Sequence, residues 1–445
     1  MTVNTNPRRR SATEGARGGG GGSGEAIASG VVDLEAFREL LTPEGRTALA
    51  EAVRVLDEGL DPVAAATRLR RAHDPALTSA ALTQAGLRRR GAAKFGADAA
   101  VMYFTPHGLE QATRAEVAAH RARRVAAAVP AGTPGDAGRA GAGGPRVLDV
   151  CCGIGGDLVA LARAGCAVDA VDLDPLTSEV ARANAAALGL SDLVAIRTAD
   201  AADTDPSAYD VLFADPARRG ARGRVFDPMA YSPSWPVTLE LASRAPAACL
   251  KVAPGIPYEL IPEGAEAEWV SYKGEVKEAV IWLGGLAHVP GAVVHGSAPP
   301  ERRATLLPSG ETLVPSGAEV GAGPVAHYLY EPDGAAVRAH LVAEVAGMVE
   351  GHLLDPRIAY ITSDVLVRTP WAAAYEVHEV MPFSLKALRA ALRKRGVGNV
   401  TIKKRGSAVD IDQLSRNLRL SGDNSGVIVL TRIGERPYAF ICQAV

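Results

Sequence analysis

Short apolar runs alternate with longer amphipathic stretches between residues 146 and 253 of this chain. Short apolar runs bounded by turn residues are typical of buried strands, and apolar residues spaced three or four positions apart are typical of helices packed on a sheet. We therefore predict successive strand–helix units that form an α/β fold around a mostly parallel sheet. The predicted strands begin at Val147, Ala167, Leu193, Tyr209 and Ala248.

Composition and turn residues divide the remainder of the chain. The glycine-rich N-terminus and a run of Gly, Ala and Pro before the first strand cannot bury a core. Proline directly after Thr42 and Asp61 predicts that helices start there. We expect a disordered tail, a helical domain, a linker, the α/β domain, an unassigned connecting region and a small α+β domain, over residues 1–30, 31–128, 129–145, 146–285, 286–378 and 379–445.

Some elements outside the first strands can also be predicted. A helix is expected across residues 109–125, and residues 275–283 are expected to enter the last hairpin of the α/β domain. For the small C-terminal domain the pattern predicts helices over 384–395 and 411–418 and strands over 399–403, 426–432 and 437–442.

The first predicted strand ends in an acid, Asp149, and runs into a glycine turn that starts a helix. The turn reads Cys151-Cys152-Gly153-Ile154-Gly155-Gly156-Asp157. Glycine has no side chain, so a ligand can approach the backbone, and the new helix offers free N–H groups. This is the architecture of a nucleotide pocket. By itself the turn allows NAD or S-adenosylmethionine (SAM), but Leu158 stands where the dinucleotide fingerprint requires its third glycine.

Acids also stand at the tips of the next predicted strands, at Asp172, Asp200 and Asp215. A carboxylate at the tip of the second strand is well placed to accept two hydrogen bonds from a ribose diol. The turn resembles motif I of class I SAM-dependent methyltransferases, and together with these acids it favours SAM over NAD. The resemblance implies that Asp200 lies near the adenine amine, and that the methionine end of SAM faces Asp149, Cys151, Gly153, Gly155 and Gly156.

Composition excludes several other classes of protein. No apolar stretch is long enough to span a membrane, and the N-terminus lacks the apolar centre of a signal peptide, so we expect a cytoplasmic protein. The five cysteines show no paired framework and are interpreted as reduced thiols. The histidines show no metal-ligand spacing, and no metal is expected. A net charge of −2 does not indicate any particular partner, so a surface that binds nucleic acid must be confined to part of the molecule.

Beyond residue 31 the whole chain resembles one family, the actinobacterial class I SAM-dependent methyltransferases with a C-terminal THUMP-like domain. The resemblance implies a Rossmann-like sheet, an N-terminal helical domain and a small α+β domain. True THUMP domains bind RNA, so it also favours RNA as the partner. It rests on Met102-Tyr-Phe-Thr-Pro-His-Gly-Leu-Glu-Gln-Ala-Thr, the turn from Asp149 to Asp157, Asp215-Pro-Ala-Arg-Arg, and Ile402-Lys-Lys-Arg-Gly with Leu430-Thr-Arg.

The residues after the fourth strand bear on the chemistry. Amine-methylating nucleic-acid enzymes place Asn/Asp-Pro-Pro-aromatic there, and Asp215 and Pro216 fit that pattern. Ala217 and Arg218 depart from it, which puts base amine methylation in doubt, although Arg218 offers a guanidinium plane that can stack on a base. Asp215, Pro216 and Arg218 are the catalytic candidates. Cys249 lacks the flanking pattern of a nucleophile and is interpreted as a small buried residue.

Clustered basic residues provide candidate phosphate contacts. Arg219 and Arg222 follow the fourth strand, and Lys403, Lys404 and Arg405 follow a strand of the C-terminal domain. The alternative is that these charges form an ordinary solvated surface. A SAM-dependent RNA methyltransferase is therefore preferred. Two alternatives stay open: a methyltransferase acting on a small molecule or protein, and a non-catalytic RNA-binding protein with a vestigial pocket.

Overall fold

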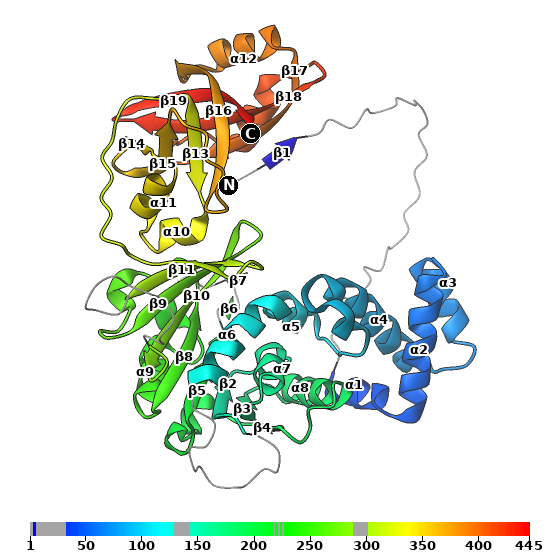
Figure 1. The fold of residues 1–445 in the computed structure, drawn as a ribbon. Coiled ribbons are helices and arrows are strands. Elements are labelled where there is room, and N and C mark those ends of the chain that lie inside the picture. Colours follow the sequence, from blue (N-terminus) through cyan, green and yellow to red (C-terminus); the bar gives the residue numbers. More distant parts are fainter. Residues whose placement is uncertain are drawn as a thin grey trace, which may run out of the picture. The chain divides into compact units, whose positions relative to one another are not determined.

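The computed structural model describes residues 3–5, 33–128, 143–217, 219–220, 223–224, 227–287 and 301–445, with the backbone alone at 3–5, 128, 219–220 and 223–224. Most of the predicted tail and linker therefore lies outside the described residues. The chain forms two compact units (Figure 1). The N-terminal unit contains Gly22–Glu268 and Glu278–Val293, and the C-terminal unit contains Met1–Gly21, Trp269–Lys277 and Val294–Val445.

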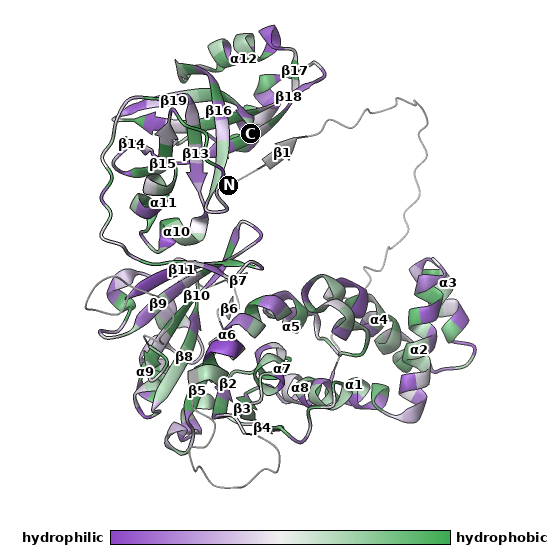
Figure 2. Ribbon diagram, in the orientation of Figure 1, coloured by the Kyte–Doolittle hydropathy of each residue, from purple (hydrophilic) through white to green (hydrophobic). Residues whose placement is uncertain are grey.

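Helices build the first part of the N-terminal unit. The predicted starts are confirmed, because the side chain of Thr42 accepts the N–H of Gly45 and that of Asp61 accepts the N–H groups of Val63 and Ala64. Purple and green stripes along α2 show its amphipathic character (Figure 2). The helices are α1 (Leu34–Leu40), α2 (Pro43–Asp57), α3 (Pro62–Leu69), α4 (Pro75–Phe95), the short 3-10 helix η1 (Gly96–Ala100), α5 (Pro106–Gln111) and α6 (Ala115–Ala128).

The continuous helix predicted over residues 109–125 is wrong, because α5 ends at Gln111 and α6 starts at Ala115. Ala112 has an extended backbone, with φ −55° and ψ 139°. The ammonium of Lys94 donates hydrogen bonds to the carbonyls of Leu109, Glu110 and Ala112. Those are carbonyls that a continuing helix would need for its own hydrogen bonds.

Seven strands of a nine-stranded sheet run in the order β9-β10-β8-β5-β2-β3-β4. Strands β5, β2, β3, β4 and β8 pair in parallel, and β10 pairs antiparallel with β8. The predicted α/β fold is thus confirmed. The elements are β2 (Arg146–Val150), α7 (Gly156–Arg163), β3 (Ala167–Asp172), α8 (Pro175–Ala187), β4 (Val194–Thr198), β5 (Val211–Ala214), α9 (Trp235–Ser243), β8 (Ala247–Val252), β9 (Glu266–Tyr272) and β10 (Glu275–Gly284).

Two apolar clusters hold this unit together. One lies between the sheet and helices α6, α7 and α8. The other fills the helical domain and also includes Ile154 of the glycine turn and Val180 of α8. The helical domain therefore packs directly on the segment that carries the predicted cofactor site. Burial of apolar area at this contact stabilises it by about 25 cal/mol per Å².

A second sheet, eight-stranded, forms the C-terminal unit in the order β1-β17-β18-β19-β16-β13-β15-β14. The connecting region supplies several of its strands. Apolar residues of α12 and α13 cover one face, and a separate cluster covers the other. The elements are β1 (Val3–Thr5), β13 (Tyr328–Pro332), α10 (Gly334–Arg338), α11 (Val342–Met348), β14 (His352–Asp355), β15 (Ile358–Ser363), β16 (Ala372–Pro382), α12 (Leu385–Lys394), β17 (Val397–Lys404), α13 (Ile411–Leu418), β18 (Asn424–Ile433) and β19 (Arg436–Ala444). Two further strands, β11 (Arg302–Leu307) and β12 (Glu311–Leu313), pair with each other and belong to the nine-stranded sheet.

Asn184 on α8 joins the helical domain to the glycine turn. Its side-chain amide accepts the N–H of Tyr103 at 2.6 Å and donates to the carbonyls of Tyr103 at 3.0 Å and Ile154 at 2.9 Å. Asn184→Ala leaves these buried groups unpaired, so we expect the free energy of unfolding to fall by about 2–4 kcal/mol. Glu179→Ala, which breaks a half-exposed ion pair on the same helix, should cost less than about 1 kcal/mol. Urea denaturation measures both, and equal effects would contradict this role.

Candidate functional site

A small pocket lies at the carboxyl end of β2, over the glycine turn. Gly153 has φ +56°, a conformation that favours glycine, and a Cβ placed there would meet no other atom within 4 Å. The pocket therefore has room for a ligand against the backbone. It is lined by Gly108, Gln111, Ala112, Thr113, Asp149, Cys151, Cys152, Gly153, Ile154, Gly156, Asp157, Phe213 and Asp215.

The helical domain provides one wall of this pocket. Gly108, Gln111 and Thr113 come from α5 and the residues after it. A Cβ on Gly108 would lie 2.3 Å from Cγ2 of Ile154, so a larger residue would push α5 away from the turn. Tyr103 and Phe104 lie in the apolar core of the helical domain and do not line the pocket.

Asp149 is the most unusual group in the pocket. It is fully buried, and neither carboxylate oxygen has a hydrogen-bond partner. Burial raises its pKa well above the usual range, and repulsion from Asp157, Asp215 and Asp172 raises it further, against the opposing effect of Lys251. A buried carboxyl surrounded by other carboxyls favours a cationic ligand, since burying an unpaired charge is costly.

Asp172 is the last residue of β3 and Asp200 follows β4, beside this pocket along the same edge of the sheet. Asp172 accepts the N–H of Gly153 at 2.9 Å and that of Asp174 at 3.0 Å, and burial raises its pKa. Asp200 is exposed and accepts the N–H of Ala202 at 2.9 Å. The structure thus brings Asp149, Cys151, Gly153, Gly156 and Asp215 into one pocket, and Gly155, Asp172 and Asp200 do not line it.

Lys251 contacts Asp215, one of the predicted catalytic residues. The ammonium of Lys251 donates to Oδ2 of Asp215 at 2.5 Å and to Oγ1 of Thr113 at 2.6 Å. The Lys251 side chain is 4% exposed and that of Asp215 is 25% exposed. Sequence analysis placed Lys251 in a strand but did not select it as a site residue. The signal was present, because a lysine inside the buried run Ala247–Val252 needs a partner.

A buried ion network continues from Thr113. Its hydroxyl donates to Oδ2 of Asp157 at 3.3 Å, and Arg121 donates to both Asp157 and Glu278. Although burial raises the pKa of Asp157, attraction to Arg121 and Lys251 holds it below the usual range. Arg121 is 1% exposed. Asp157 therefore has cationic partners on two sides, in contrast to Asp149.

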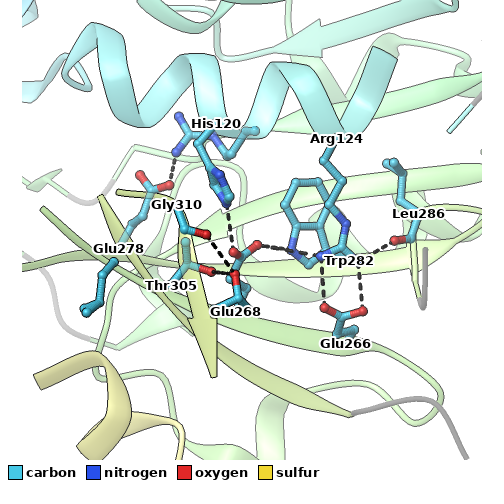
Figure 3. Close-up of polar contacts among 12 residues, drawn as sticks. His120, Arg124, Glu266, Glu268, Glu278, Trp282, Leu286, Thr305 and Gly310 are labelled. Atoms are coloured by element: carbon cyan, nitrogen blue, oxygen red, sulfur yellow. Dashed lines mark hydrogen bonds and ion pairs between the residues drawn. The ribbon is translucent and has the colours of Figure 1, made fainter. Parts of the chain in front are cut away.

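Further ion pairs fix α6 on β9 and β10 (Figure 3). His120 lies 2.8 Å from Oε1 of Glu268, and Arg124 makes a bidentate contact with Glu266 at 2.9 and 2.8 Å. The indole N–H of Trp282 donates to Glu268 at 3.0 Å, and the Arg124 guanidinium lies over the Trp282 ring. These contacts anchor the helix that carries Arg121.

The loop after Asp215 is described only in part. Pro216 is buried, and Ala217 pairs with Ser232 across a single bridge. Arg218 and Arg222 lie outside the described residues, and for Arg219 only the backbone in the short strand β6 (Arg219–Gly220) is described. Cys249 is fully buried in the sheet core, where burial raises its thiol pKa, in keeping with a packing role.

Lys403 and Lys404 are the last residues of β17 and Arg405 follows the strand, and all three have internal partners. Lys403 forms an ion pair with Glu331 at 2.8 Å, and Lys404 donates to the carbonyl of Val409 at 3.0 Å. Arg405 donates to the carbonyl of Ala359 at 3.1 Å and lies over the Tyr360 ring. By contrast, exposed cations on α12 and α13, without an ion pair among the described residues, form a basic helix surface comprising Lys386, Arg393, Lys394, Arg416 and Arg419.

Within the described ranges, no three His, Cys, Asp or Glu side chains are grouped as metal ligands would be. The same ranges contain no helix with the length and apolarity needed to cross a membrane.

Comparisons with known proteins agree with this geometry. Residues 147–217 match a family described as a methyltransferase domain, residues 372–444 one described as THUMP domain-like, and residues 33–91 a domain of unknown function. Two Mycobacterium tuberculosis proteins, from strains CDC 1551 and H37Rv, are each 36% identical over 375 residues, or 80% of this chain and 94% of theirs. Both are described as uncharacterized SAM-dependent methyltransferases.

Among solved structures, a candidate methyltransferase from Porphyromonas gingivalis W83 has the same fold, with a TM-score of 0.67 at 19% identity. The match covers 90% of this chain and 98% of that one. The predicted fold class, the THUMP-like C-terminal domain and SAM as the cofactor are confirmed. The identity over most of both chains and the two domain matches show that this protein belongs to the class I SAM-dependent methyltransferases with a C-terminal THUMP-like domain.

Proposed function

We propose that the protein transfers the methyl group of SAM to RNA, at an acceptor atom held against Asp215. The observation that carries the proposal is that Asp149 and Asp215 line one pocket. Asp149 is suited to the cofactor because it is buried without a partner, and Asp215 is suited to the acceptor because it is partly exposed. Five unpaired cysteines are compatible with work in the reducing cytoplasm.

The residues of the pocket fit SAM. Its ammonium and sulfonium groups are cations, and Asp149 is a buried carboxyl that lacks one. In this proposal Asp149, Cys151, Gly153, Gly155 and Gly156 hold the methionine end, Asp172 the ribose and Asp200 the adenine. When bound, SAM supplies an electrophilic methyl group.

The protein contributes mainly orientation. Holding two reactants in line is worth several kcal/mol of the barrier without any covalent step on the enzyme. Asp215 accepts a hydrogen bond from the acceptor and Pro216 shapes the tip, while the wall formed by α5 and Thr113 covers the pocket. Arg218, Arg219 and Arg222 are proposed to contact the substrate.

RNA is favoured as the substrate by the C-terminal unit. The THUMP-like match covers the helices that carry the basic helix surface defined above. Exposed cations without ion-pair partners are free to replace the counterions of a phosphate backbone. Lys403, Lys404 and Arg405 remain candidates, but each would have to leave a present partner, so we expect smaller contributions from them.

Asp149→Asn should affect binding and stability in opposite directions. Loss of the carboxylate removes a charge-assisted interaction, so SAM affinity measured by calorimetry should fall about ten- to a hundred-fold. Loss of a buried, unpartnered acid should leave the melting temperature of the free protein unchanged or higher. Asp203→Asn, an exposed acid at the same edge of the sheet, should change neither quantity. Undiminished affinity in Asp149→Asn would remove the assigned role.

The same residue predicts a pH dependence. Its pKa is raised in the free protein, so stability from this group falls as pH rises above the usual aspartate value of about 3.9 towards the folded pKa. A cationic ligand favours the ionised form. SAM binding should therefore release protons and strengthen as pH rises above the usual aspartate value. Calorimetry in buffers of different ionisation enthalpy measures the release, which Asp149→Asn should reduce.

RNA as the substrate is tested by comparing modified nucleosides in a strain lacking the gene with those of its parent. We expect one methylated nucleoside to disappear from a single RNA size class and to return with the wild-type gene. A gene encoding Asp215→Asn serves as the matched control and should not restore it. Unchanged nucleosides in every size class would favour a small-molecule or protein substrate.

The basic helix surface should set the salt dependence of RNA binding. Replacing Arg393, Lys394 and Arg416 by Gln removes cations that can pair with phosphates, so affinity should fall and the slope of log K against log salt should decrease by about 0.7 for each phosphate that is no longer neutralised. Lys403→Gln, whose ammonium is already paired with Glu331, should alter the slope less. Filter binding over a salt series measures both. An unchanged slope in the triple variant would place RNA elsewhere.

A further inference from the structure

One oxygen of the Asp215 carboxylate, the group proposed to face the methyl acceptor, already has a hydrogen-bond partner. Its Oδ2 accepts a hydrogen bond from Lys251 at 2.5 Å, and Oδ1 has no partner among the described residues. Lys251 is almost fully buried and does not line the pocket, whereas Asp215 does. The hydrogen bonds by which Lys251 reaches the pocket are those to Asp215 and Thr113.

A second residue, Thr113 in the wall formed by the helical domain, also holds the Lys251 ammonium. Thr113 accepts a second hydrogen bond from Lys251 at 2.6 Å and donates to Asp157, which is in turn paired with Arg121. An ammonium group has donors only, so both of its partners must present lone pairs. Lys251 therefore holds Asp215 in the orientation in which a lone pair of Oδ2 points towards the ammonium.

We propose that Lys251 is a positioning residue that fixes the Asp215 carboxylate as a hydrogen-bond acceptor, so that the site selects substrates whose nucleophilic atom carries a hydrogen. The inference rests on the proposed function, because it takes Asp215 to face the acceptor. It narrows the acceptor to an N–H or O–H group.

The atoms and charges of the step balance. The lone pair of the acceptor nitrogen or oxygen forms the new bond to the methyl carbon, and the carbon–sulfur bond breaks with its electrons returning to sulfur. The proton of the acceptor passes to Oδ1 of Asp215 and from there to solvent. A carboxylate acceptor has no such proton at neutral pH and would be repelled by Asp149, Asp157 and Asp215.

The test measures methyl transfer to an unfractionated, briefly heated extract of a strain lacking the gene. Such an extract holds RNA, protein and small molecules in unmethylated form, and radiolabelled SAM reports transfer to any of them. The proteins compared are wild type, Lys251→Met, Lys251→Arg, Asp215→Asn and the double variant Asp215→Asn/Lys251→Met. SAM affinity is measured in parallel by calorimetry.

We expect Lys251→Met to lower the rate at least about tenfold with SAM affinity within about threefold of wild type, and Lys251→Arg to restore most of the rate. In the Asp215→Asn background the further loss should be less than about threefold, because a residue that acts through Asp215 is not additive with it. Equal losses in both backgrounds, or no loss in either, would overturn the positioning role.

Two further readouts keep the outcomes separate. If Lys251→Met does not fold, Thr113→Val removes the hydrogen bond between Thr113 and Lys251 together with that to Asp157, and leaves the contact between Lys251 and Asp215 in place. It should still lower the rate by about threefold or more, whereas a wild-type rate would overturn the proposal. Labelled product should carry the methyl group on nitrogen or oxygen. A methyl ester released by mild base, or a carbon-bound methyl group, would overturn the substrate class. No transfer by the wild type would instead overturn the proposed function itself.

Discussion

The concentration of carboxyl groups at the carboxyl end of the sheet is the constraint on which the rest of the site depends. Asp149, Asp157 and Asp215 line one small pocket, and a buried ion costs several kcal/mol unless it is paired. Arg121 and Lys251 offset this cost for Asp157 and Asp215. Asp149 alone has no partner, so the folded protein retains a buried carboxyl group that a cationic ligand can complete.

This constraint also explains why the helical domain is part of the site. The hydroxyl of Thr113 comes from the segment between α5 and α6, and the cation Arg121 comes from α6 itself. Neither residue belongs to the sheet whose acids they satisfy. The contact of His120 with Glu268 and the ion pair of Arg124 with Glu266 hold α6 on β9, and the Arg124 guanidinium lies over Trp282 of β10. Displacing α6 would leave Asp157 and Glu278 buried without their cation. The docking of α6 and the charge balance of the pocket therefore depend on each other.

Local signals made much of the fold predictable. These signals lie close together in the sequence: proline after Thr42 and Asp61, the glycine turn and the spacing of the acids. The structure confirms the elements that they predict. The break at Ala112 was missed because its cause, Lys94, lies on another helix. Lys251 and Arg121 were missed for the same reason. A charge in an apolar run signals a partner, but only the fold shows which acid it is.

The net charge of the chain is only −2, but acids gather in the pocket and exposed cations gather on α12 and α13. The acidic pocket over the glycine turn suits a cationic ligand but repels phosphate. An RNA substrate could therefore gain little affinity from the pocket itself, and its backbone would have to be bound elsewhere. The exposed cations of α12 and α13 meet that requirement. Binding energy from such a remote surface can be used to bring a neutral acceptor group into an acidic site. A methyltransferase with this pocket thus needs a separate basic surface if its substrate is a nucleic acid. A small neutral substrate would give the exposed cations of α12 and α13 no role in binding.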